Sequence, residues 1–159
     1  MREQDPRVPP EVEEYLVSIN AGAGALGGAI GASVGGAAPA TGGHGGARGG
    51  ARGARWVRTV VEERAEGSPG GRDDVLRRVA AAFPQARRLD SHDDLVRLAV
   101  PIGRTGLQHI VVDLVLRPAA GATAAPATEV RLRAYGKEGL FSRKPTAATV
   151  DKVLAAATG

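Results

Sequence analysis

The chain has 159 residues, a formal net charge of +4 and no cysteine. This length fits a single domain, and the missing cysteines exclude disulfide frameworks, thiolate zinc sites and cysteine nucleophiles. Aromatic residues make up only 3% of the chain, so little is available to line a roomy aromatic pocket.

Residues 1–20 are predicted to be a charged leader with a short helix. Pro9 and Pro10 break the chain, after which Val12, Leu16 and Ile19 recur at helical spacing. Charge then disappears, because residues 15–47 contain no Asp, Glu, Lys or Arg.

Residues 21–54 form a Gly/Ala-rich segment of low complexity. Over 24–36 small residues recur at every fourth position in two rows, interleaved with Leu26, Ile30 and Val34 at the same spacing. This small-xxx-small pattern resembles a glycine zipper, which lets membrane helices approach closely. The candidate helix-association residues are Gly24, Gly27, Gly28, Gly31 and Gly35.

Two interpretations of this segment stay open. A helix over about 20 residues would just cross a hydrocarbon core of roughly 30 Å. Each interior glycine, however, costs a helix about 1 kcal/mol relative to alanine, which favours a flexible linker. The four-residue steps of Leu26, Ile30 and Val34 favour a helix at a membrane, with self-association through the small residues.

Residues 42–55 read as a Gly/Arg arm that cannot bury enough surface to fold. Arg48, Arg52 and Arg55 are its candidate anion or phosphate contacts. Nucleic acid is an unlikely partner, because three arginines are few and Trp56 is the only aromatic residue near them. Beside a membrane-inserted segment, the same arginines would hold their flank on the cytoplasmic side.

Residues 55–158 are predicted to fold on their own as a small α+β domain. The element order is β-α-β-β-β-β-α, which gives an antiparallel sheet of about five strands with the helices packed on one face. We expect strands at 56–63, 86–90, 95–102, 107–117 and 129–135, a helix that Asp73 caps and Pro84 ends, and a last helix from Pro145.

This domain resembles the helix-grip domains of the SRPBCC/START-like superfamily. The resemblance covers residues 55–158 and consists of an opening strand (WVRTVVEE), a helix that begins DDVLRRVAAAF, a strand meander and a closing helix. It implies a cavity between the sheet and the closing helix that takes a lipid or another small apolar ligand. Bulky pocket-lining residues are scarce here, which favours a filled core.

Three motifs contain residue types found in catalytic or binding sites, but each lacks the spacing that such a site needs. Gly22, Gly24 and Gly27 spell GxGxxG, but no acidic residue follows at the distance that a dinucleotide ribose needs. The run 91–94 (SHDD) reads as a polar turn, because adjacent residues cannot converge on one reacting atom. His109 and Asp113 are about 13 Å apart on one strand face, too far to share a metal.

The sequence therefore predicts a non-enzymatic accessory or interaction protein. We expect no catalytic residues, no metal and no cofactor, and no ligand-binding residue can be assigned. The expected location is the cytoplasm or the cytoplasmic face of a membrane. The alternatives are a helix-grip-like binder of an apolar ligand and a soluble module whose Gly/Arg arm contacts nucleic acid; a protein partner stays unknown.

Overall fold

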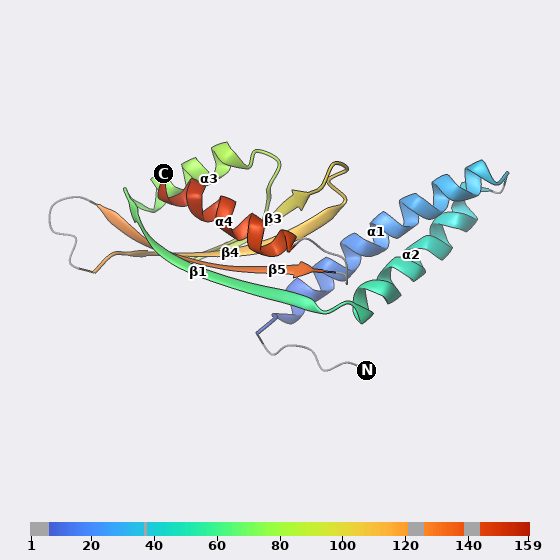
Figure 1. The fold of residues 1–159 in the computed structure, drawn as a ribbon, viewed down its shortest axis with the longest axis horizontal. Coiled ribbons are helices and arrows are strands. Elements are labelled where there is room, and N and C mark those ends of the chain that lie inside the picture. The colour runs from blue at the N-terminus through green and yellow to red at the C-terminus, as the bar shows by residue number, and fades with distance from the viewer. Residues whose placement is uncertain (1–6, 37, 121–125, 139–143) are drawn as a thin grey trace.

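The computed structural model describes residues 7–36, 38–120, 126–138 and 144–159, and its centre is a five-stranded antiparallel sheet (Figure 1). The sheet order is β1-β5-β4-β3-β2, so the first and last strands of the chain are neighbours. The α+β class and the antiparallel sheet predicted from the sequence are confirmed. The strands are β1 (Thr59–Pro69), β2 (Arg87–His92), β3 (Leu95–Ile102), β4 (Gln108–Pro118) and β5 (Ala127–Lys137).

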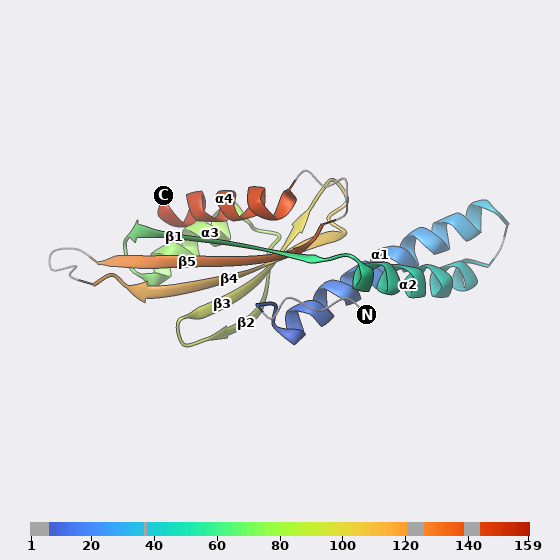
Figure 2. The ribbon, with the colours of Figure 1, turned by 60° about the horizontal axis from the view of Figure 1, so that its bottom comes forward.

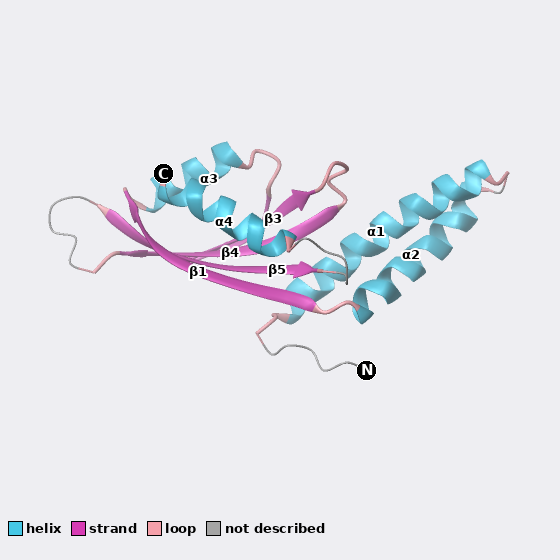
Figure 3. Ribbon diagram, viewed as in Figure 1, coloured by secondary structure: helices cyan, strands magenta, loops and turns pink. Residues whose placement is uncertain are grey.

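Two helices, α3 (Arg72–Ala82) and α4 (Pro145–Thr158), cover one face of the sheet (Figure 3). Alternate residues of β3, β4 and β5 point toward them, and Leu98, Val112 and Leu132 lie in this main core. Val150 and Val153 of α4 are fully buried against the same side chains. The space between the sheet and these helices is occupied by aliphatic side chains.

Helix α1 (Pro10–Val34) begins on the opposite face of the sheet, so the helices do not all pack on one side (Figure 2). Its first turns bury Val12 and Leu16 against Val111 and Tyr135 in a second, smaller core. The boundary expected at residue 55 therefore does not separate two independently packed units, because α1 supplies part of the packing of the sheet.

Helix α2 (Pro39–Trp56) returns antiparallel to α1, and the two form a hairpin that projects past the end of the sheet (Figures 1 and 2). The expectation of an unfolded Gly/Arg arm over 42–55 is thus wrong. Glycine disfavours an isolated helix, but close contact between two glycine-rich helix faces overrides that preference. The predicted short helix and the zipper segment are likewise one continuous helix.

Several element ends differ from those predicted by the sequence. Strand β1 starts at Thr59 because α2 extends through Trp56, and it continues to Pro69. The N-cap of α3 is Gly71 instead of Asp73, and the Asp74 carboxylate accepts a hydrogen bond from the Gly71 N–H at 3.1 Å. These differences move boundaries without changing the element order.

Candidate functional site

The face of the sheet beneath α1 carries a row of alternating charges in register across all five strands. Its members run from β1 through β5, β4 and β3 to β2: Glu63, Arg133, Asp113, Arg97 and Asp90. Opposite charges on directly paired strands attract each other across the ladder. The row also divides this face into a part that α1 covers and a part that it leaves open.

The centre of the row is a buried ion pair. Arg97 Nε and Nη2 donate to the two carboxylate oxygens of Asp113 at 2.6 and 2.8 Å, and both residues are 7% exposed. Glu11 of α1 accepts a third hydrogen bond from Arg97 at 2.9 Å. The Tyr135 hydroxyl donates to Asp113 at 3.3 Å. Burial raises the pKa of Tyr135 to about 12, and the Asp113 charge adds to the shift.

Two further polar contacts fasten α1 to the sheet. Lys137 forms an ion pair with Glu13, and the Thr59 hydroxyl donates to the same carboxylate at 2.6 Å. The Tyr15 hydroxyl lies 2.7 Å from Nδ1 of His109 on β4. Burial lowers the pKa of His109, so the neutral ring is favoured there. These titratable groups hold the helix in place.

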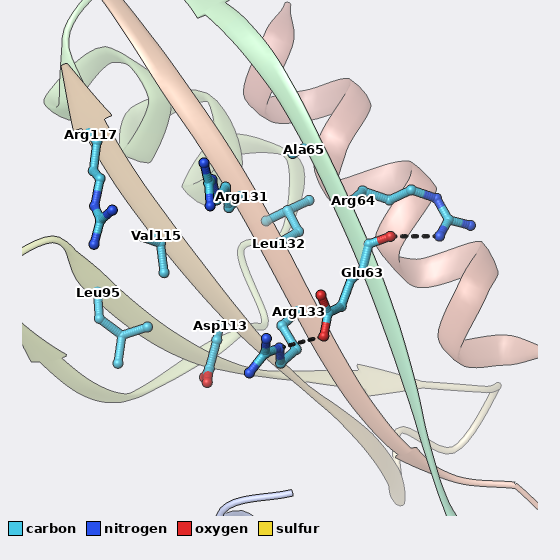
Figure 4. A pocket seen from close by; sticks show the side chains of 10 residues that line it. All are labelled: Glu63, Arg64, Ala65, Leu95, Asp113, Val115, Arg117, Arg131, Leu132 and Arg133. Atoms are coloured by element: carbon cyan, nitrogen blue, oxygen red, sulfur yellow. Dashed lines mark hydrogen bonds and ion pairs between the residues drawn. The ribbon is translucent and has the colours of Figure 1, made fainter. Parts of the chain in front are cut away.

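The uncovered part of this face is an open groove of about 640 Å³ (Figure 4). Leu95, Val115 and Ala65 contribute apolar lining, and Arg117, Arg131 and Arg133 contribute guanidinium groups. Each of these arginines has a carboxylate neighbour, such as Glu63 at 2.8 Å from Arg133. A guanidinium has five donors, so the groove has the chemistry to hold a carboxylate or another anion with an apolar part.

The groove lacks the constellation that a hydrolytic or metal-dependent reaction needs among the residues described. Asp113 is paired with Arg97, and Glu63 is paired with Arg133. The structure groups no three metal-ligating side chains within its described ranges. His92 pairs with Asp90 on β2 at 3.2 Å, in the strand end and turn where the sequence indicated only a polar turn.

The hairpin brings some of the predicted helix-association glycines together. A Cβ added at Gly24 would lie 2.3 Å from the carbonyl oxygen of Gly46, and one at Gly28 would lie 2.1 Å from that of Gly42. Gly50 is similarly close to Asn20. The seam of the hairpin therefore consists of glycines from both helices, with backbone against backbone.

The other predicted glycines lie outside this seam. Added Cβ atoms at Gly27 and Gly31 would meet no atom within 4 Å, and one at Gly35 would meet only the preceding turn of its own helix. Of the two small-residue rows in the sequence, one is used inside the molecule and the other faces outward. Association between copies through the outward row stays a prediction.

The outer half of the hairpin, residues 23–36 and 38–47, is its tip; it carries no Asp, Glu, Lys or Arg and exposes three large aliphatic side chains. Leu26, Ile30 and Val34 are 48%, 58% and 87% exposed. The hydroxyls of Ser33 and Thr41 donate to backbone carbonyls at 2.8 and 3.0 Å. Helix α1 is long and apolar enough to cross a membrane by length and composition, and its apolar window is not buried.

Arg48, Arg52 and Arg55 lie on α2 and are exposed. None of the three has an ion pair or side-chain hydrogen bond within the described part of the chain, whereas the groove arginines do. None of the three lines the groove or contacts the Arg97–Asp113 pair. The structure therefore presents two separate candidate sites, the helical hairpin, with an uncharged tip and arginines nearer its base, and the groove.

Comparison with protein-family models, curated proteins and solved structures finds no match to this chain. The resemblance to helix-grip domains accordingly rests on element order alone.

Sequence reasoning missed the residues that fasten α1 to the sheet. The sequence placed Asp113 on one strand face with His109, but its partners Arg97, Glu11 and Tyr135 were not identified. The signal was present in the hairpin of β3 and β4, because pairing the strands around the turn at 103–107 sets Arg97 opposite Asp113. No comparable signal placed α1 over them.

Proposed function

We propose that this chain is a non-enzymatic accessory protein held at a membrane surface by the tip of its helical hairpin. The observation that carries the proposal is the combination of a charge-free tip with the three exposed side chains Leu26, Ile30 and Val34. Moving exposed aliphatic side chains from water into hydrocarbon lowers the free energy.

Apart from the exposed imidazole of His44, the polar groups of the tip are compatible with lipid. Helical backbone satisfies its own N–H and C=O groups, which is the first requirement of any segment in hydrocarbon. The two tip hydroxyls, on Ser33 and Thr41, are also satisfied internally. The glycine seam removes a further cost, because close packing of the helices shields the backbone that glycine would otherwise expose.

The size of the tip favours entry into one leaflet instead of a full crossing. The seam contacts Gly24–Gly46 and Gly28–Gly42 place Arg48 level with Gly22. From Gly22 to Val34 a helix rises about 18 Å. One leaflet contributes about 15 Å of hydrocarbon. The full crossing by about 20 residues that the sequence left open is less favoured, because α1 ends at Val34 and its residue Leu16 packs on the sheet.

The anchoring of α1 on the sheet connects the tip to the rest of the protein. The two helices of the hairpin enter and leave the membrane on the same side. The sheet and its groove therefore lie together on that side. Basic residues at the hairpin base favour the cytoplasmic side. The groove is then a surface on which a partner can be held next to the membrane.

The alternative of a ligand cavity between the sheet and α4 has less support. Val150, Val153 and Ala157 are fully buried there, together with the aliphatic side chains of three strands. A lipid in that space would have to displace packed side chains, which costs several kcal/mol for a large apolar ligand. The open groove lies on the other face.

Flotation of the full chain with lipid vesicles tests the proposal. We expect the protein to float with the vesicles, and the variant Leu26→Ser/Ile30→Ser/Val34→Ser to stay at the bottom of the gradient. Leu107→Ser is the matched control, because Leu107 is an exposed aliphatic residue away from the hairpin. A full chain that does not float, or a triple variant that floats equally well, would show that the proposal is wrong.

A further inference from the structure

The three arginines of α2 form one row on the outer edge of the hairpin. Arg48 and Arg52 are each two residues beyond a seam glycine, Gly46 and Gly50, and therefore about 200° around the helix from α1. Arg55 follows one turn later and is also exposed. Residues 15–56 contain these three cations and no carboxylate.

The height of each arginine along the hairpin follows from the seam. Arg48 is level with Gly22, as the contacts of Gly24 and Gly28 require. Arg52 and Arg55 lie about 6 and 10 Å farther from the tip, at 1.5 Å per residue. All three are thus on the domain side of Leu26, the first exposed aliphatic residue.

We propose that Arg48, Arg52 and Arg55 bind the phosphates of anionic phospholipids when the hairpin tip enters the leaflet; this inference rests on the proposed function. With Val34 about 18 Å beyond Arg48, a tip that reaches the middle of the bilayer leaves Arg48 in the headgroup layer. Arg52 and Arg55 then lie within about one Debye length of the charged surface.

Guanidinium groups suit this role because their planar donors match phosphate oxygens. The hairpin arginines have all of their donors available, since no carboxylate of the described residues pairs with them. A cation close to an anionic leaflet contributes about a fivefold gain in binding. Three together predict a preference for anionic over neutral lipid on the order of a hundredfold.

RNA is the competing polyanion for the same side chains. Phosphate alone does not distinguish the two, but the neighbouring surface does. The three arginines border an aliphatic tip, whereas single-stranded nucleic acid is held by aromatic side chains on which its bases stack. Only one exposed aromatic side chain of α2, that of Trp56 next to Arg55, stands beside the arginines, which is too few for a stacking surface. The observations therefore favour lipid.

The test compares full-length proteins on vesicles of phosphatidylcholine alone and of phosphatidylcholine mixed with phosphatidylglycerol. We expect tighter binding to the mixed vesicles, weakened by salt. Arg48→Gln/Arg52→Gln/Arg55→Gln should lose on the order of a hundredfold on mixed vesicles and keep its binding to neutral ones. The control Arg77→Gln/Arg88→Gln/Arg104→Gln removes the same charge from exposed positions outside the hairpin and should lose far less.

The outcomes separate the two proposals. Binding to neither kind of vesicle would overturn the proposed function itself. Equal binding to both kinds by the full chain, or equal losses in the two triple variants, would overturn only the arginine site. Binding of a single-stranded RNA oligonucleotide that depends on the three arginines, with vesicle binding unaffected by their removal, would assign the row to nucleic acid and overturn the inference.

Discussion

Arg97 on β3 and Asp113 on β4 stand directly opposite each other and form a two-point ion pair that is almost completely buried beneath the first turns of α1. Removing charges from water costs several kcal/mol per ion, and this cost is recovered only where the remaining donors and acceptors are also used. Here Glu11 accepts a further hydrogen bond from Arg97, and the Tyr135 hydroxyl donates one to Asp113.

Breaking this pair should be strongly destabilising. We expect Asp113→Asn to lower the free energy of unfolding by about 3 kcal/mol, because it takes the buried carboxylate away from Arg97 and leaves that charge with Glu11 alone. Denaturant titration of the full chain measures the loss. Asp94→Asn removes a partner of Arg117 at an exposed pair and should change stability by no more than about 1 kcal/mol. Equal effects of the two substitutions would contradict this account of the second face.

The seam of the hairpin predicts opposite outcomes for neighbouring glycines. Gly28→Ala should open or destabilise the hairpin, since its Cβ would meet the Gly42 carbonyl. Gly27→Ala faces open space and should stabilise the helix by up to about 1 kcal/mol, the difference in helix propensity. Hydrogen exchange of the amides in α1 and α2 reports both effects. A stabilising Gly28→Ala would disprove the seam.

His109 should make the docking of α1 sensitive to pH. Its lowered folded-state pKa means that the unfolded chain takes up a proton first as pH falls below about 6.5, so stability is complete above that pH and declines below it. His109→Gln removes the titration. The difference in unfolding free energy between the full chain and this variant should change between about pH 8 and about pH 5. Parallel pH profiles would exclude the effect.

The two parts of the hairpin should differ in their importance for folding. Deleting residues 1–56 uncovers Val111, Tyr135 and the Arg97–Asp113 pair, so we expect an unstable, aggregation-prone product. Replacing only residues 23–47 by a short Gly/Asn loop keeps the docked turns of α1 and should leave the sheet folded. Amide NMR spectra distinguish these outcomes. A well-dispersed spectrum of residues 57–159 alone would contradict the role assigned to α1.

Much of the sheet could be predicted because its signal is local. Alternation in 95–102 and 107–117 identified β3 and β4 and the side chains that face the main core, such as Leu98 and Val112. Turn residues separated the strands, and the amphipathic spacing of Val150 and Val153 indicated α4. The element order followed from these signals.

The hairpin could not be predicted because its stability is not local. The glycines of 42–55 disfavour helix individually, and only contact with a second glycine row more than ten residues away makes them favourable. The contact of Glu11 with Arg97 is also non-local, since the two residues are 86 positions apart in the sequence. The alternation revealed the face of these residues but gave no sign of what covers it.

Fluorescence quenching by lipids brominated on their acyl chains tests most directly whether the hairpin tip enters a leaflet. The chain has one tryptophan, Trp56, so Ile30→Trp combined with Trp56→Phe gives a single probe at the tip. We predict strong quenching of the indole at position 30 and little quenching of Trp56 in the unmodified chain, because Trp56 is about 12 Å farther from the tip than Arg48. Emission from position 30 that brominated vesicles leave unchanged would contradict the account.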